Sequence, residues 1–180
     1  MESTEAQSTQ RYNLAMTEKP TFTTRLLTPA DQALVWEALH VALWDPPPAP
    51  LRPREILDDP GVRIYAENYG RPGDVGVAGL LDTEPEPIGA CWMRLTEDGK
   101  GLAYIDEVTP QLGIALFAPF QRRGYGKPLM LAALEAARAS GHPQVSLTVH
   151  PENPAIALYE KCGFRKVEIR RTYHLMVVEL

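Results

Sequence analysis

The segment QRRGYGKPLM, residues Gln121–Met130, lies between an apolar run that ends at Phe120 and an alanine-rich run that begins at Leu131. The apolar run is typical of a buried strand, and the alanine-rich run is typical of a helix. Glycines at such a junction let the main chain approach a ligand closely. Free N–H groups and the dipole at a helix N-terminus attract anions. The segment therefore predicts a strand-to-helix turn that holds an anion, with a solvated glycine-rich turn as the alternative.

Three known anion-binding patterns can be compared with this segment. The P-loop needs a glycine where this chain has Gln121 and a hydroxyl residue where it has Pro128. The dinucleotide pattern G-x-G-x-x-G fits Gly124 and Gly126, but its third glycine is replaced by Leu129. The pattern Q-x-x-G-x-G fits completely. Three cations add positive charge beside it: Arg122, Arg123 and Lys127.

Composition limits the classes of protein to which the chain can belong. With 180 residues, of which 44% are hydrophobic, the chain is long enough for one domain with a substantial core. A net charge of -5 argues against nucleic acid as a partner and favours a cationic or neutral small molecule. Cys91 and Cys162 have no metal-ligand spacing, so no metal is expected. Two reduced thiols are predicted, with one long-range disulfide as the alternative.

The N-terminal residues 1–20 are polar and acidic, which predicts a flexible tail ahead of a domain at 21–180. They lack the apolar stretch of a signal peptide. No apolar run approaches the roughly 20 residues that a membrane helix needs. The sequence therefore predicts a cytoplasmic protein with no membrane partner.

Strand and helix patterns alternate along the chain. Strands are expected at 21–27, in a hairpin over 74–95, at 110–117, at 144–149 and in a final hairpin over 165–180. Helices are expected over 29–42, 54–58, 60–68, 129–141 and 153–163, the last with Asn153 as its N-cap. This order indicates a mixed α/β fold. Gly113 stands inside an expected strand, which indicates a bulge or a close approach by a ligand.

Two stretches carry a resemblance to a known family. ALFAPFQRRGYGKPLM, at 115–130, resembles the acetyl-CoA motif of the GCN5-related N-acetyltransferase (GNAT) superfamily, and LTVHPENPAIALYEKCGF, at 147–164, resembles the strand and helix that follow it. The resemblance extends over 110–164 and is weaker over 21–95. It implies a single domain with a central, mostly antiparallel mixed sheet and helices on both faces. It also implies transfer of an acetyl group from acetyl-CoA to a primary amine of a small molecule or peptide, by direct attack in a ternary complex.

The resemblance also assigns residues to the cofactor. Main-chain groups of Leu116, Phe117 and Ala118 would pair with the pantetheine arm, and Asn153 would touch the same arm. The pyrophosphate would lie on the motif and its main-chain amides, formed by Gln121, Arg122, Arg123, Gly124, Tyr125, Gly126 and Lys127. Pro128 has no N–H, so one amide contact fewer is expected there.

Further residues are candidates for the chemistry. The resemblance implies that Tyr159 protonates the leaving thiolate, although an aromatic on the buried face of a short helix is the alternative reading. Amides within 113–116 are candidates for the oxyanion site. Glu107 is the first candidate for the base, acting directly or through water, and His150 is the second because histidine changes charge between pH 5 and 8. Either is also compatible with a surface residue. Cys162 is expected to serve packing rather than a covalent intermediate.

Several functions remain open on the sequence alone. A module that binds acyl-CoA without turnover, and a transferase that uses a longer acyl-CoA, are the alternatives. The acceptor wall is expected at 44–53, with Trp44, Trp92 and Tyr104 as lining residues or as core. The oligomeric state is open, with a homodimer as one option.

Overall fold

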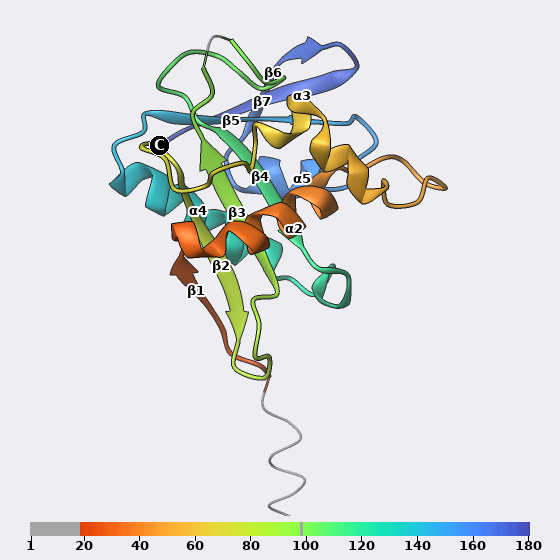
Figure 1. The fold of residues 1–180 in the computed structure, drawn as a ribbon, viewed down its shortest axis with the longest axis vertical. Coiled ribbons are helices and arrows are strands. Elements are labelled where there is room, and N and C mark those ends of the chain that lie inside the picture. The colour runs from red at the N-terminus through yellow and green to blue at the C-terminus, as the bar shows by residue number, and fades with distance from the viewer. Residues whose placement is uncertain (1–18, 98) are drawn as a thin grey trace, which may run out of the picture.

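A computed structural model describes residues 19–97 and 99–180 of the chain (Figure 1). Most of the predicted N-terminal tail therefore lies outside the described residues. Within them, no helix is both long enough and apolar enough to cross a membrane. The same residues contain no group of three or more His, Cys, Asp or Glu side chains placed to hold a metal ion.

One seven-stranded sheet forms the centre of the described chain, with the order β1-β2-β3-β4-β5-β7-β6. All neighbours pair antiparallel except β4 and β5, which are parallel. This confirms the expected mixed, mostly antiparallel sheet. The strands are β1 (Phe22–Leu26), β2 (Val75–Leu81), β3 (Gly89–Arg94), β4 (Gln111–Leu116), β5 (Gln144–Val149), β6 (Arg165–Arg170) and β7 (Tyr173–Glu179).

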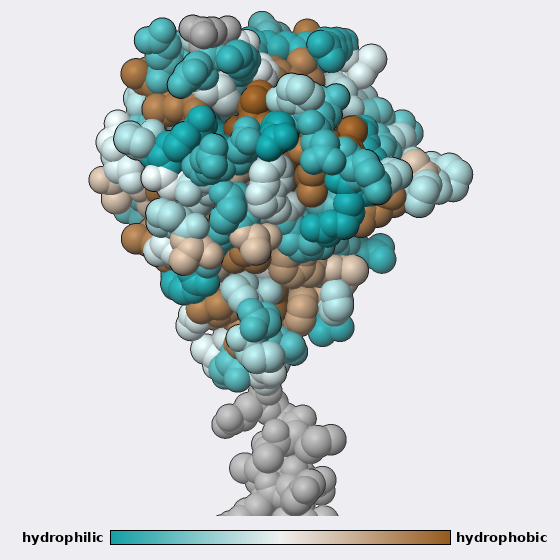
Figure 2. All heavy atoms as spheres, viewed as in Figure 1, coloured by the Kyte–Doolittle hydropathy of each residue, from teal (hydrophilic) through white to brown (hydrophobic). Residues whose placement is uncertain are grey.

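Helices cover both faces of the sheet, as expected (Figure 1). On one face α4 packs against β1 to β4, and on the other α2 packs against β3 and β4. From the side shown in Figure 2, apolar residues are scattered among hydrophilic ones rather than gathered in one patch. The helices are α2 (Gln32–Ala42), α3 (Pro60–Arg63), α4 (Gly126–Ala139) and α5 (Ile156–Lys161), with short 3-10 turns at Pro29–Asp31, Arg54–Asp58 and Ala118–Phe120.

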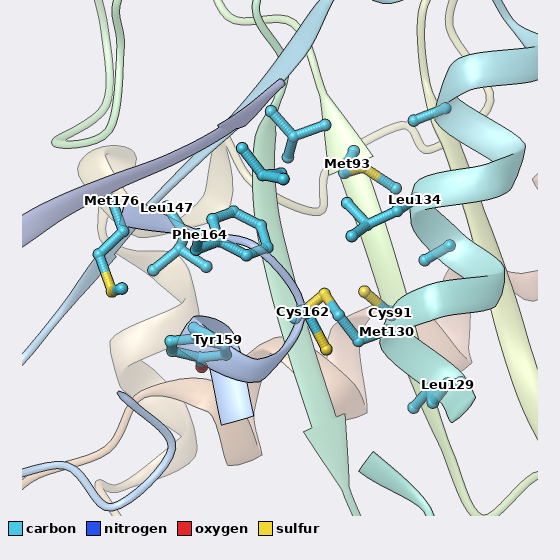
Figure 3. Packing of buried hydrophobic residues seen from close by; sticks show 14 of the residues in the cluster. Cys91, Met93, Leu129, Met130, Leu134, Leu147, Tyr159, Cys162, Phe164 and Met176 are labelled. Atoms are coloured by element: carbon cyan, nitrogen blue, oxygen red, sulfur yellow. The ribbon is translucent and has the colours of Figure 1, made fainter. Parts of the chain in front are cut away.

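Strand β3 supplies side chains to both cores, and every one of its residues is buried. Ala90 and Trp92 belong to the cluster under α2, whereas Cys91 and Met93 belong to the larger cluster under α4. This alternation follows from the two-residue period of a strand covered on both faces. Both cysteines are free, as predicted, and Figure 3 shows them in the α4-side core. Burial raises the pKa of each thiol, which argues against either one as a nucleophile.

Gly113 does not mark a bulge, and it has a packing reason. It is the cross-strand partner of Trp92, and the β3–β4 register runs without interruption. A Cβ atom at Gly113 would lie 2.5 Å from Cζ2 of the Trp92 ring. The indole therefore occupies the space that a side chain would need, and its Nε1 donates to the main-chain oxygen of Tyr65 at 2.8 Å.

Helix boundaries differ from the predicted ones at three places. Helix α4 begins at Gly126 rather than Leu129, so the glycine motif runs directly into its first turn. Helix α3 is shorter than the expected 60–68, because turns replace the helix after Arg63. The Asn153 side chain accepts a hydrogen bond from the Ala155 N–H at 2.9 Å, which forms a turn just before α5 begins at Ile156.

Candidate functional site

The parallel strands β4 and β5 separate soon after they meet. Their only Cα pairing in the described chain joins Gln111 and Ser146, whereas β4 stays paired with β3 as far as Leu116. Strand β5 likewise stays paired with β7 along its whole length. The sheet therefore has a gap in its middle, with unpaired main-chain groups of β4 on one side.

Alternation along β4 decides which main-chain groups face this gap. The Phe117 N–H donates to Ile88 on the β3 side at 2.9 Å. Because successive residues point their main-chain groups to opposite sides, Ile114 and Leu116 face the gap. The Leu116 oxygen accepts a hydrogen bond from Gln121 Nε2 at 2.8 Å. Of the predicted 116–118 segment, Leu116 therefore offers an N–H to an extended ligand, and the Phe117 N–H is already occupied.

The glycine motif leaves a row of main-chain donors unused. Within the described residues, the N–H groups from Arg122 through Lys127 donate to no other protein group. Arg122 and Gly124 adopt left-handed backbone angles, with φ of 57° and 92°. A Cβ atom at Gly124 would meet nothing within 4 Å, so this turn borders open space. Free N–H groups on such a turn and on the first turn of a 14-residue helix form a site suited to an anion.

Other side chains of the motif have structural roles. Tyr125 is buried and stacks on Phe22, with 5.5 Å between ring centroids. Gly126 lets α4 approach α5, because a Cβ atom there would lie 3.0 Å from a methyl group of Leu158. The side chains of Arg122, Arg123 and Lys127 are exposed. Within the motif, these three cations and the free amides are therefore the groups available to a ligand.

A cavity of about 850 Å³ borders the start of the gap. One side of it is formed by the end of α2, the loop after it and α3. The other side is formed by the 99–103 loop, the start of β4, the end of β5 and the β6–β7 turn. Several predicted site residues line it together: Trp44, Trp92, Gly113, His150, Asn153 and Tyr159. Tyr104 is not among the lining residues, and Glu107 is exposed in the loop before β4 and does not line the cavity either.

Tyr159 reaches the cavity from α5. Its side chain packs against Phe164, with 6.0 Å between ring centroids, and the residue is only 9% exposed (Figure 3). Burial, with a smaller contribution from Cys91, raises the pKa of its hydroxyl well above the usual range. The hydroxyl has no hydrogen-bond partner among the described residues. Tyr159 therefore presents a neutral donor at the cavity wall at any physiological pH.

His150 lies between two aromatic side chains on the same wall. Its ring centroid is 5.7 Å from that of Trp44 and 5.8 Å from that of Tyr173. Nδ1 accepts a hydrogen bond from the Glu152 N–H at 3.2 Å. In the neutral ring the proton therefore lies on Nε2. His150 in this arrangement is a donor toward the cavity, and it would have to break the Glu152 bond to accept a proton.

Two polar networks hold the cavity walls. Arg52 binds both oxygens of Asp45, each at 2.5 Å, which lowers the pKa of that carboxyl and closes the proline-rich loop. On the opposite wall, Gln111 donates to Thr96 and to the Lys100 oxygen, and its Oε1 accepts from Ala103. The expected acceptor wall at 44–53 is thus joined by a second wall at 99–103, which no local sequence signal indicated.

Known proteins of one family are similar to most of this chain. The model of the acetyltransferase (GNAT) family matches residues 36–164. A [ribosomal protein bS18]-alanine N-acetyltransferase from Salmonella typhimurium (strain LT2) is 36% identical over 89 residues, 46% of this chain and 60% of that protein. The chain thus spans about 60% of the length of that curated relative.

Solved structures share the fold. The ribosomal-protein-S18-alanine N-acetyltransferase from Escherichia coli superposes with a TM-score of 0.62 at 19% identity, covering 88% of this chain and 94% of that chain. Spermidine N-acetyltransferase from Vibrio cholerae, in complex with CoA and spermine, gives a TM-score of 0.56 at 16% identity, covering 88% and 95%. One fold thus serves acceptors as different as a protein and a polyamine in these relatives, so the acceptor has to be inferred from the cavity.

Proposed function

The chain belongs to the acetyltransferase (GNAT) family, and from this premise we propose that it transfers the acetyl group of acetyl-CoA to a primary amine of a small molecule or peptide. The observation that carries the proposal is the row of unused main-chain donors from Arg122 through Lys127, beside an open β4 edge and a cavity. A module that binds acyl-CoA without turnover would need the row of donors and the open β4 edge. It would not need a cavity of about 850 Å³ that is lined by a neutral tyrosine donor.

The cofactor fits the described residues in two parts. The amides from Arg122 through Lys127 would hold the pyrophosphate, with the exposed cations of the motif beside it. Ile114 and Leu116 would pair with the amides of the pantetheine arm as an added strand does. Asn153 and Gly113 line the cavity near the point where this arm would end. Pro128 contributes no N–H, which limits the amide row to Lys127.

Catalysis in this proposal rests mainly on positioning. When bound, acetyl-CoA supplies a thioester whose thiolate is a fair leaving group. Holding the amine against it is worth up to roughly 7–11 kcal/mol of the barrier in favourable cases. Tyr159 donates its hydroxyl proton toward the sulfur, and free main-chain N–H groups of β4 within 113–116 face the acyl oxygen. A hydroxyl with a raised pKa is a weak acid, so its contribution is expected at the low end for general acids.

The proton of the attacking amine leaves to water in this proposal. His150 Nδ1 is occupied by the Glu152 N–H, and its Nε2 carries the proton of the neutral ring. Glu107 is exposed outside the cavity, so it takes part only through a chain of water molecules. We expect Glu107→Gln to lower kcat/KM less than tenfold for this reason. Steady-state kinetics on an accepted amine measures the effect, and a loss of several hundredfold would make Glu107 the base.

Acetyl-CoA is expected to bind and to stabilise the folded chain. At about 100 times its dissociation constant, a ligand adds about 2.7 kcal/mol to the free energy of unfolding. Titration calorimetry and thermal unfolding measure both effects, and absence of both would refute the proposal. Mass spectrometry of an amine panel incubated with acetyl-CoA separates the enzyme from a binding module. The same panel with longer acyl-CoAs tests the preferred acyl length.

The valine substitution Gly124→Val is expected to weaken acetyl-CoA binding by at least tenfold. Gly124 has a φ of 92°, which a β-branched residue rarely adopts, and its Cβ would enter the open space beside the amide row. Gly141→Val is the matched control, because Gly141 has a φ of 84°, also borders open space and lies at the other end of α4. Both variants should lose similar stability, but only Gly124→Val should lose cofactor affinity. Equal affinities in the two variants would move the anion site elsewhere.

A further inference from the structure

The cavity wall has the opposite charge to the chain as a whole. The chain carries a net charge of -5. Among the described residues, however, the side chains that line the cavity include no carboxylate. The cationic side chains among them are Arg52, Lys100 and Arg171. The composition favours a cationic or neutral ligand, whereas the cavity wall favours an anionic one.

Within the described residues, two of these cations have no internal counter-ion. Arg52 is bound by Asp45, which neutralises it in place. Lys100 and Arg171 form no ion pair within the described residues, and both are exposed at the rim of the cavity. Unpaired cations at a cavity entrance attract anions and repel polycations.

The backbone that carries Lys100 and Arg171 is fixed rather than loose. The Lys100 oxygen accepts hydrogen bonds from Thr96 Oγ1 at 2.6 Å and from Gln111 Nε2 at 2.9 Å. Next to Arg171, the Arg170 guanidinium donates to the main-chain oxygens of Leu102 and Tyr104. The β6–β7 turn is therefore tied to the loop that carries Lys100. Both cations therefore lie on lining segments that are tied to each other.

The cations that would serve the cofactor are a separate set. Arg122, Arg123 and Lys127 lie on the glycine motif, and none of them lines the cavity. Farther along the cavity wall, His150 offers its Nε2–H beside Trp44 and Tyr173. A ligand in the cavity would thus meet cations at the rim and a further donor among aromatic rings.

We propose that the acceptor is a primary amine that also carries a carboxylate, such as an amino acid or a short peptide with a free C-terminus. Arg171 and Lys100 bind the carboxylate at the rim while the amine reaches the region between Gly113 and Tyr159. Arginine suits this role because its planar guanidinium binds a carboxylate through two parallel hydrogen bonds. The inference rests on the proposed acetyl transfer, and it excludes polyamines as preferred acceptors.

The test uses amines in matched pairs, each amino acid or dipeptide beside its C-terminal amide, with spermidine as the polycation. With acetyl-CoA saturating, release of CoA gives kcat/KM for each. We expect kcat/KM for the free acid to exceed that for its amide by about tenfold, mainly through a lower KM. This contrast between acid and amide should shrink at high salt. In the double variant Lys100→Gln/Arg171→Gln the contrast should fall to about twofold, with unchanged acetyl-CoA affinity. Arg165→Gln is the control, since Arg165 is exposed and does not line the cavity.

A binding measurement separates this inference from the proposed function. Calorimetric titration of the CoA-saturated protein with the same pairs requires no turnover. If the acid binds more tightly than its amide but nothing is acetylated, the proposed reaction fails and the assignment of the cavity stands. If the amide or spermidine binds or reacts as well as the acid, or if none binds, the inference is overturned. It is also overturned if the double variant keeps the full contrast or loses cofactor affinity.

Discussion

The substitution Arg94→Leu is expected to lower the free energy of unfolding by about 3–5 kcal/mol. The Arg94 and Asp74 side chains are each only 1% exposed and form an ion pair at 2.5 Å. Leucine removes one charge and leaves the Asp74 carboxylate buried without its counter-ion, with only the Gly70 and Arg71 N–H groups as donors among the described residues. The same guanidinium also donates to the main-chain oxygens of Ile64, Glu67 and Asn68. Loss of these bonds adds to the cost, because the carbonyl groups stay buried.

Denaturant unfolding measures this effect, with Arg165→Leu as the control. Arg165 and Glu179 also form an ion pair, but their side chains are 72% and 76% exposed, so little stability should be lost there. The double variant Arg94→Met/Asp74→Leu should recover part of the loss, because no unpaired charge remains in the core. Equal losses for Arg94→Leu and Arg165→Leu would show that the buried pair is not a main support of the fold.

This ion pair also supports the cavity. Arg94 lies at the end of β3, and its three carbonyl partners lie in the segment that follows α3. Ile64 and Tyr65 of that segment line the cavity. Trp92, also on β3, donates to the Tyr65 oxygen, so β3 fixes the segment at two places. Loss of Arg94 is therefore expected to affect acceptor KM even where the chain still folds.

The substitution Tyr159→Phe is expected to lower kcat about 10–100-fold with little change in acetyl-CoA affinity. Phenylalanine keeps the ring and its contact with Phe164 but removes the hydroxyl, the neutral donor on the cavity wall. General acids contribute about 10²–10⁴-fold. We expect the lower end or below, because the thiolate leaves fairly well unaided and the donor is a weak acid. Since burial raises the pKa of Tyr159, ionisation of this hydroxyl should not reduce activity below about pH 10.

Tyr69→Phe is the matched control for this experiment. The Tyr69 hydroxyl is also buried without a partner among the described residues, burial also raises its pKa, and it does not line the cavity. Both variants should keep their melting temperature within a few degrees, but only Tyr159→Phe should lose turnover. An unchanged kcat in Tyr159→Phe, with acetyl transfer shown to be rate-limiting, would remove Tyr159 from the mechanism. A large fall in melting temperature would instead assign the hydroxyl a structural hydrogen bond.

Local sequence patterns predicted the order of elements well, because the signals that define them are short-range. Alternation identified β5, proline and glycine identified the turns, and the two hairpins followed from their flanking turn residues. The glycine motif indicated the anion site before any tertiary contact was known. Boundaries were less predictable: α4 begins at Gly126, because the motif itself forms the first helical turn.

Long-range packing explains the features that local sequence patterns did not predict. Gly113 was interpreted as a bulge or a ligand position, but the strand register has no bulge there and a ring on the neighbouring strand explains the glycine. Main-chain groups of Phe117 were assigned to the pantetheine arm, but its N–H donates to Ile88 of the preceding hairpin. Both outcomes depend on strand register, which pairs residues far apart in the chain. Gln111, whose amide holds the second cavity wall, likewise has partners in a separate loop.

The sequence by itself therefore determined the family and the α/β fold, and it predicted an anion-binding turn and Tyr159 as a donor, because these depend on residues close together in the chain. The tertiary structure alone decided the charge of the acceptor cavity. Arg52, Lys100 and Arg171 come from three separate segments, and the chain that carries them is acidic overall. Electrostatic attraction depends on distance in space rather than along the chain. Only the folding of these segments around one cavity gives it a basic wall.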